Sequence, residues 1–112
     1  MINKNFYCKI CGYNLDYNPW GEDGKNPDYS FCSSCGVEFG YQDYSLESIL
    51  EFRNKWIENG MVWSEEKYVP KSKDWNPINE IKNIGIDFSK KEIVEEYKKE
   101  IPNIEEIIQP YS

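Results

Sequence analysis

The sequence predicts an α+β fold in which a cysteine-rich N-terminal part is followed by three or four short helices. Two Cys-x-x-Cys pairs lie near the N-terminus, and short stretches of alternating polar and apolar residues surround them. After residue 45 the apolar residues recur at three- and four-residue steps, the period of a helix that buries one face. The N-terminal part is therefore predicted to be a zinc ribbon, in which two β-hairpins each carry one cysteine pair.

The four cysteines are predicted to form one metal site. Cys8, Cys11, Cys32 and Cys35 are the only cysteines of the 112-residue chain, which contains no histidine. A glycine follows each pair, and a residue that adopts positive φ lets the backbone curl around an ion. This spacing matches structural zinc sites, so we expect one structural Zn²⁺ with four cysteine ligands. Disulfide pairing is the alternative in an exported protein, but residues 1–6 lack a signal peptide's apolar stretch, so we expect reduced thiols and a cytoplasmic location.

Short strands are expected on either side of the cysteine pairs. Residues 13–17 alternate as a half-exposed strand does, residues 29–31 lead into the second pair, and residues 37–41 leave it. Between the pairs, Asp23-Gly24 is typical of a tight hairpin turn. These stretches would form the two hairpins of the ribbon.

The strongest helix signal covers residues 46–59. Ser45 is a favourable N-cap residue, and Gly60 lies just past the expected end. Apolar residues at helical spacing define the face that should pack on the ribbon: Leu46, Ile49, Leu50, Trp56 and Ile57.

Shorter helical segments are expected in the last third of the chain. Asn76-Pro77 combines an N-cap residue with a proline at the first helical position and predicts a helix over residues 78–84. Ser89 begins a capping-box pattern for a helix over residues 90–101, and Asn103 can cap one last turn. We expect the ribbon (residues 1–44) and the helical part (residues 45–112) to fold as one cooperative domain, so that chelation unfolds at least the ribbon.

The charge of the chain argues against nucleic acid as a partner. The formal net charge is −7, and residues 1–44 carry three lysines against six acidic residues. A four-thiolate zinc centre would add about two more negative charges. Nucleic-acid binding needs a basic surface that displaces counterions from phosphate, so it is not expected. No apolar stretch is long enough to span a membrane.

The composition also argues against an enzyme. Without histidine there is no ordinary nucleophile and base pair, and the four cysteines are committed to the metal. A zinc ion with four protein ligands has no open position for an activated water. The neighbouring acidic residues are interpreted as solvated surface charges, and no catalytic residue is assigned.

The first cysteine pair resembles rubredoxin, which holds one iron in four cysteines and carries electrons. The resemblance covers residues 7–13 and Asp16. Against it, the loop between the two pairs is shorter than rubredoxins use, Ser33 stands where they have proline, and the chain continues far beyond Cys35. Because iron and zinc accept the same tetrahedral sulfur set, an iron electron carrier stays an alternative.

The second cysteine pair and the residues after it resemble a family of small bacterial cysteine-rich proteins named for a Cys-Pro-Cys-Cys motif (CPCC-type). The resemblance rests on residues 32–40, residues 53–57 and residues 75–77, and it covers residues 6 to about 85. This chain has two serines where the motif has Pro-Cys, so the family's extra cysteine is not needed as a ligand. The family is largely uncharacterised, and some members look like immunity proteins of toxin systems. Residues 86–112 are interpreted as an extension particular to this chain.

These observations predict a non-enzymatic, zinc-binding protein whose acidic, aromatic-rich surface binds a protein partner. A narrower hypothesis, implied by the resemblance, is an immunity protein that inhibits a basic toxin. The alternatives are a rubredoxin-like iron electron carrier and a nucleic-acid-binding zinc ribbon. The partner's identity and the oligomeric state are left open.

Overall fold

The computed structural model describes residues 4–111, which form short helices joined by long irregular segments. In chain order the elements are η1 (Lys4–Phe6), α1 (Leu46–Glu58), α2 (Pro77–Ile81), η2 (Lys82–Ile84), α3 (Lys91–Lys98), α4 (Ile104–Ile108) and η3 (Gln109–Tyr111), where η marks a 3₁₀ turn.

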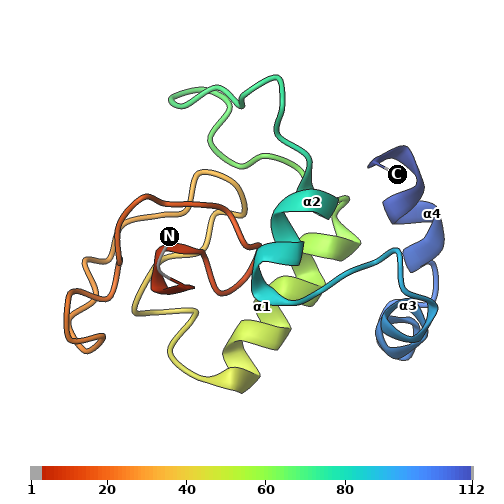
Figure 1. Ribbon diagram of the computed structural model, residues 1–112, viewed down its shortest axis with the longest axis horizontal. Helices are drawn as coiled ribbons and strands as arrows, with labels where there is room; N and C mark the ends of the chain where they lie inside the picture. The colour runs from red at the N-terminus through yellow and green to blue at the C-terminus, as the bar shows by residue number, and fades with distance from the viewer. Residues whose placement is uncertain (1–3, 112) are drawn as a thin grey trace.

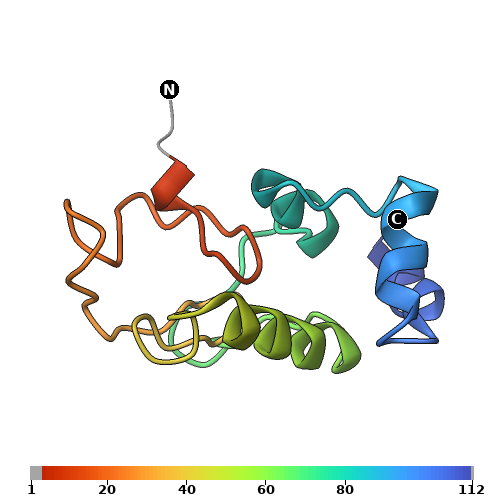
Figure 2. The same cartoon turned by 90° about the horizontal axis from the view of Figure 1, so that it is seen from below.

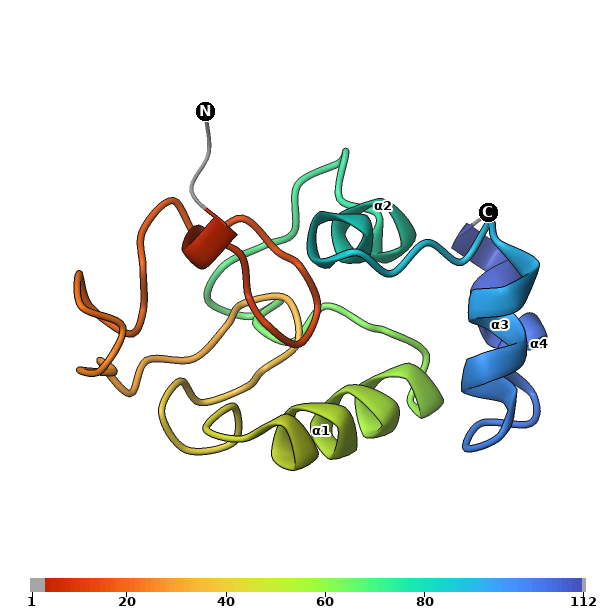
Figure 3. The same ribbon diagram turned by 60° about the horizontal axis from the view of Figure 1, so that its bottom comes forward.

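The helices α1 and α2 occupy the middle of the molecule (Figure 1). The irregular N-terminal part lies on one side of them, and α3 with α4 lies on the other. Figure 2 shows α1 along one edge, opposite α2 and the N-terminal turn. The loops that carry the two cysteine pairs, drawn in red and orange in Figure 3, lie beside each other between η1 and α1. The cysteines therefore lie in the irregular N-terminal part, on the side that faces the two central helices.

The predicted α+β zinc ribbon is wrong. Residues 4–111 contain no β-strand, and the two isolated antiparallel bridges, Tyr7 with Asn14 and Phe31 with Glu38, account for their β pairing. Each loop is closed by backbone hydrogen bonds beside its bridge, such as Cys8 N to Tyr13 O at 2.9 Å. We call these two closed loops the first and second knuckle loops (residues 8–12 and 32–36). They exist without the hairpins that were predicted to carry them.

Side chains of Asn and Asp divert the backbone just outside each bridge. Asp16 N donates to Asn14 Oδ1 at 3.0 Å, and Ser30 N donates to Asp28 Oδ1 at 2.9 Å. Asp16 and Tyr29 adopt φ values of 64° and 58°, which lie outside the extended region. Such local side-chain bonds compete with a ladder of backbone hydrogen bonds. The pairing therefore stops after one bridge in each loop.

Helix α1 begins as predicted. Ser45 Oγ accepts the Ser48 N–H at 3.1 Å, and Ser48 Oγ accepts the Ser45 N–H at 3.2 Å, which satisfies two backbone donors at the helix start. The helix ends at Glu58, and Gly60 follows with a φ of 96°.

The predicted buried face of α1 is only partly right. Trp56 and Ile57 are buried, but Leu46 is 72% exposed and Leu50 is 40% exposed. Arg53 is buried instead, at 8% exposed. Ile49 is partly buried and packs against the core, so the predicted face is covered at Ile49, Trp56 and Ile57 but open at Leu46 and Leu50.

The shorter helices also form, but two predicted caps do not: Ser89 does not cap α3, and Asn103 precedes α4 without a side-chain cap bond. Asn76 caps α2, because its Oδ1 accepts the Ile78 N–H at 2.9 Å. Ser89 does not cap α3: its N–H and its hydroxyl both donate to Asp87 Oδ1, at 3.0 and 2.6 Å. The residue in the N-cap position is Lys90, which makes no side-chain cap bond. A local turn with Asp87 has replaced the capping box.

The C-terminal segment belongs to the packed core. Ile101 and Ile104 are at most 1% exposed. Tyr111 OH donates to Gly60 O at 2.8 Å, and Asn76 Nδ2 donates to Tyr111 O at 3.0 Å. The end of the chain is thus tied to the residues that follow α1 and to the start of α2.

Candidate metal centre

The fold brings the four cysteine sulfurs together. The Sγ atoms of Cys8 and Cys35 lie 3.7 Å apart, those of Cys11 and Cys32 also lie 3.7 Å apart, and all four lie within 4.8 Å of one another. Four sulfurs placed tetrahedrally at about 2.3 Å from a metal ion would be about 3.8 Å apart. The four cysteines can therefore hold one metal ion, and a tetrahedral set of four sulfurs accepts either zinc or iron.

Burial separates the sulfurs from solvent. Cys8, Cys11 and Cys32 are at most 1% exposed, and Cys35 is 7% exposed. Burial raises the pKa values of the Cys11 and Cys35 thiols well above the usual value for cysteine. Hydrogen bonds from Cys11, Cys35 and Cys8 instead lower the pKa of Cys32 well below that value. A thiol must lose its proton to bind a metal. Metal uptake should therefore release protons and be favoured by rising pH.

Side chains from later in the chain donate hydrogen bonds to the backbone of the first knuckle loop. Arg53 of α1 donates from Nε to Ile10 O at 2.8 Å and from Nη2 to Lys9 O at 2.6 Å. Asn83 of η2 donates from Nδ2 to Gly12 O at 2.9 Å. These donors satisfy three loop carbonyls and hold the backbone on either side of Cys11.

The segment after α1 donates hydrogen bonds to the second knuckle loop in a similar way. Ser64 N donates to both Ser33 O and Ser34 O, at 3.1 and 3.0 Å, and Glu65 N donates to Ser33 O at 3.0 Å. Trp75 Nε1 donates to Ser34 Oγ at 3.3 Å. The metal centre thus rests on contacts that reach across the chain. The predicted folding of residues 1–44 and 45–112 as one unit stays a prediction.

Arg53 is the supporting residue that the sequence interpretation missed. It lies four residues after Ile49 and three before Trp56, so it falls on the apolar face of α1. A charged residue in that position is a sign of a buried polar contact. Its third contact, from Nη1 to Tyr97 OH at 3.3 Å, connects the first knuckle loop with α3.

The Trp20 side chain is held by other residues of the N-terminal part. Its Nε1 donates to Asp43 Oδ2 at 2.8 Å, and Asp43 is only 2% exposed. The other carboxylate oxygen of Asp43 accepts the Gly40 N–H at 2.7 Å, and Lys9 Nζ lies 4.7 Å from the Trp20 ring centroid. These contacts connect the segment between the knuckle loops to the residues that precede α1.

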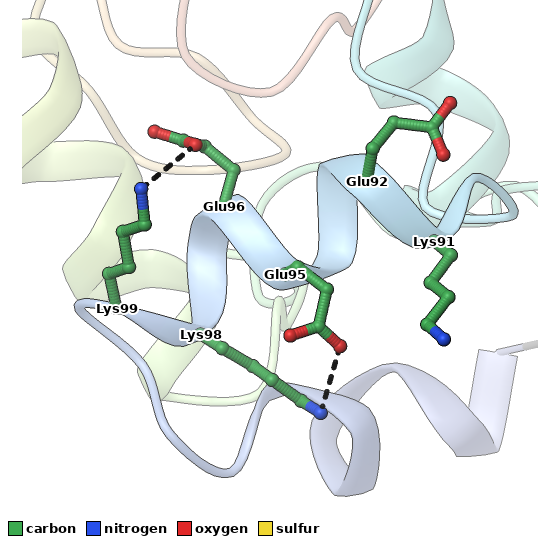
Figure 4. Close-up of a pocket in the computed structure, with 6 residues that line it drawn as sticks. All are labelled: Lys91, Glu92, Glu95, Glu96, Lys98 and Lys99. Atoms are coloured by element: carbon green, nitrogen blue, oxygen red, sulfur yellow. Dashed lines mark hydrogen bonds and ion pairs between the residues drawn. The ribbon is translucent and has the colours of Figure 1, made fainter.

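The outer face of α3 has the character of a solvated surface. Figure 4 shows lysine and glutamate side chains around a shallow hollow, with Lys98 paired to Glu95 and Lys99 paired to Glu96. Such exposed pairs on one helix add little stability and define no site. Among residues 4–111, no helix is both long and apolar enough to span a membrane.

Fold and site together define a small protein of short helices with four clustered cysteines that can hold a metal ion. The uncharacterised protein YozI of Bacillus subtilis (strain 168) is 31% identical to it over 83 residues, an alignment that covers 60% of this chain and 69% of the relative. The chain belongs to the family of this Bacillus protein. No protein-family model matches the chain, and no solved structure matches it.

Proposed function

We propose that the four cysteines hold one zinc ion that stabilises the fold, and that the protein acts by binding another protein rather than by catalysis. The proposal depends on one observation above all: four buried sulfurs with tetrahedral spacing. Four protein ligands complete the coordination of zinc, which leaves no position for a substrate or an activated water. A metal held in this way contributes to folding.

Metal analysis tests the first part of the proposal. Protein purified without added metal should contain one zinc per chain, as measured by elemental mass spectrometry, and should be colourless. One iron per chain with a visible thiolate absorption would support the rubredoxin-like alternative instead. Protein without bound metal that keeps its fold and does not bind added zinc would overturn the assignment.

Exposed apolar side chains around the start of α1 support a protein partner. Tyr41 and Tyr44 are 66% and 69% exposed, and with Phe52 of α1 they line a hollow of about 360 Å³. Leu46 is 72% exposed in the same stretch of the chain. Aromatic side chains are enriched in protein interfaces, whereas large apolar residues are seldom left together in solvent.

The net charge of −7 favours a basic partner, because complementary charge speeds association and disfavours wrong partners. The narrower form of the proposal is an immunity protein that inhibits a basic toxin, as implied by the resemblance to CPCC-type proteins. Co-purification with the product of a neighbouring gene, and rescue of cells that express that product, would support it. Cells that die at the same rate with and without this protein would rule out the immunity role.

The protein-binding surface has its own test. Replacing Tyr41 and Tyr44 by serine should weaken binding of the partner, with unchanged metal content. Replacing Tyr68, which is 75% exposed in the distant segment between α1 and α2, by serine is the matched control and should leave binding unchanged. Equal effects of the two changes would argue against this surface.

A further inference from the structure

A cavity of about 250 Å³ lies between Tyr13, which directly follows the first knuckle loop, the segment that joins α1 to α2, and Glu80 of α2. Three aromatic residues line it, Tyr13, Trp63 and Trp75, together with two acidic residues, Asp74 and Glu80. We call these five residues the aromatic cage. None of them is a cysteine of the metal centre.

Trp63 packs edge to face with the other two rings of the cage, Tyr13 and Trp75. The Tyr13 and Trp63 ring centroids are 5.3 Å apart with an interplanar angle of 82°, and those of Trp63 and Trp75 are 5.4 Å apart at 79°. A flat ligand stacks on one face or between parallel faces. Perpendicular rings instead surround a compact group from several sides, as in the aromatic cages that recognise ammonium groups.

The polar edges of both indoles are already used within the protein. Trp63 Nε1 donates to Val69 O at 2.6 Å, and Trp75 Nε1 donates to Ser34 Oγ at 3.3 Å. Tryptophan has no other hydrogen-bonding group, so a ligand can use only the π surface of these rings. Trp63 is 9% exposed and forms the floor of the cage, whereas Trp75 is only partly buried and offers the more open ring. A π surface attracts a cation.

The acidic residues of the cage have no cationic partner. None of the ion pairs within residues 4–111 involves Asp74 or Glu80. Glu80 is half-buried, and burial raises the pKa of its carboxyl group. The ammonium group of Lys71 lies 5.8 Å from the Trp75 ring centroid, so this ring already attracts a cation from within the chain. Two unpaired carboxylates beside three rings favour a positively charged ligand that keeps N–H groups to donate.

We propose that the aromatic cage binds the ammonium group of a lysine side chain from a basic protein partner. The proposal rests on the proposed function for the existence of that partner, and it adds the chemistry of recognition. A flat guanidinium stacks on one aromatic face, whereas a compact tetrahedral ammonium can contact perpendicular rings at the same time. The rings would cover the methylene chain and the charge, and the carboxylates would accept the N–H groups.

The test uses the full-length, zinc-loaded protein and small probes, so that it does not depend on finding the partner. NMR would follow the indole N–H signals of Trp63 and Trp75 during titration with Nα-acetyl-lysine methylamide. Both signals should shift in a saturable way, whereas those of Trp20 and Trp56 should not. The norleucine analogue, which lacks the charge, should cause no saturable shift. Equal responses to lysine and norleucine, or no response to lysine, would overturn the proposal.

Substitution of the acidic residues tests the same site. The double change Asp74→Asn and Glu80→Gln should weaken binding of the lysine probe by about tenfold. The control change Glu92→Gln and Glu100→Gln removes the same charge at exposed positions of the C-terminal part and should alter affinity less than about twofold. Unchanged zinc content and circular dichroism would show that both variants fold. If both double changes weaken probe binding equally, the effect comes from the net charge of the protein and the proposed site is overturned.

Two further outcomes separate the site from related explanations. Tetramethylammonium that binds about tenfold more tightly than the lysine probe would assign the cage to a free quaternary ammonium compound, against the proposal. A partner that binds the Asp74→Asn/Glu80→Gln variant as well as the original would overturn the cage and leave the proposed function standing. Binding of the lysine probe in the cage by a protein that binds no protein partner would overturn the proposed function and leave the chemistry of the cage standing.

Discussion

Replacing Gly12 by alanine should separate the metal centre from α2. A Cβ atom on Gly12 would lie 2.1 Å from the Glu80 backbone oxygen and 3.0 Å from the Ile81 Cα, whereas ordinary contact begins at 3.4 Å. The obstructing atoms are backbone, so no side-chain rotation can relieve the overlap. The first knuckle loop or the end of α2 would have to move by about 1 Å, and Ile81 is fully buried.

A second glycine isolates the contribution of the close contact. Gly24 has nearly the same backbone angle as Gly12, with φ values of 72° and 80°, but no atom lies within 4 Å of where its Cβ would be. Gly24→Ala should therefore cost only the left-handed conformation, about 1–2 kcal/mol. Gly12→Ala adds the cost of overpacking a close contact, so the total should be about 3–5 kcal/mol.

Urea unfolding of the zinc-loaded proteins, followed by circular dichroism, measures both costs. Competition with a chelator should also show weaker zinc binding for Gly12→Ala, because Gly12 directly follows Cys11. Similar zinc affinity and free energies of unfolding within about 0.5 kcal/mol for the two variants would refute the role assigned to this contact.

Three other changes have definite expected outcomes. Removal of the metal with a chelator should abolish the helical circular dichroism of the whole chain, because the binding energy of a structural zinc, about 10–16 kcal/mol, is as large as the stability of an ordinary domain; retained helix would contradict this. Arg53→Met should lower the free energy of unfolding in urea by about 2–3 kcal/mol, since it leaves the Lys9 and Ile10 carbonyls without their donor; an unchanged midpoint would show that water replaces the guanidinium. Glu80→Gln should stabilise the protein at neutral pH, because burial raises the pKa of this carboxyl group above its unfolded value and disfavours the charged form. That gain should fade as the pH falls through the raised pKa and then the unfolded pKa, and thermal melts at several pH values that differ by a constant amount would disprove it.

Local patterns predicted the helices well. Ser45 and Asn76 act as N-caps because a side-chain oxygen two or three residues from a free N–H needs no help from the rest of the fold. Local patterns failed where two local solutions competed. Ser89 makes a turn with Asp87 in place of a cap, and the Asn and Asp residues beside the knuckle loops make turns in place of strands.

The supporting contacts of the metal centre had a weaker signal in the sequence. Arg53 lies on the apolar face of α1 and could have been recognised from the sequence as a buried donor. The residues near it in the sequence do not indicate that its acceptors are the carbonyls of residues 9 and 10. Leu46 had the opposite problem, because it continues the apolar spacing of α1 and is nevertheless exposed. Helical periodicity says which residues share a face but not how far a neighbouring segment extends along it.

The sequence by itself determined the four cysteines as a candidate metal site and the positions of the helices, since both depend on residues a few positions apart. Only the tertiary structure decided that the knuckle loops carry no β-sheet. It also decided that Arg53, Ser64 and Asn83 hold these loops by hydrogen bonds to their carbonyl groups. The same holds for the aromatic cage, whose rings come from segments dozens of residues apart. Contacts between distant segments depend on how the whole chain packs, and a pattern of nearby residues does not encode them.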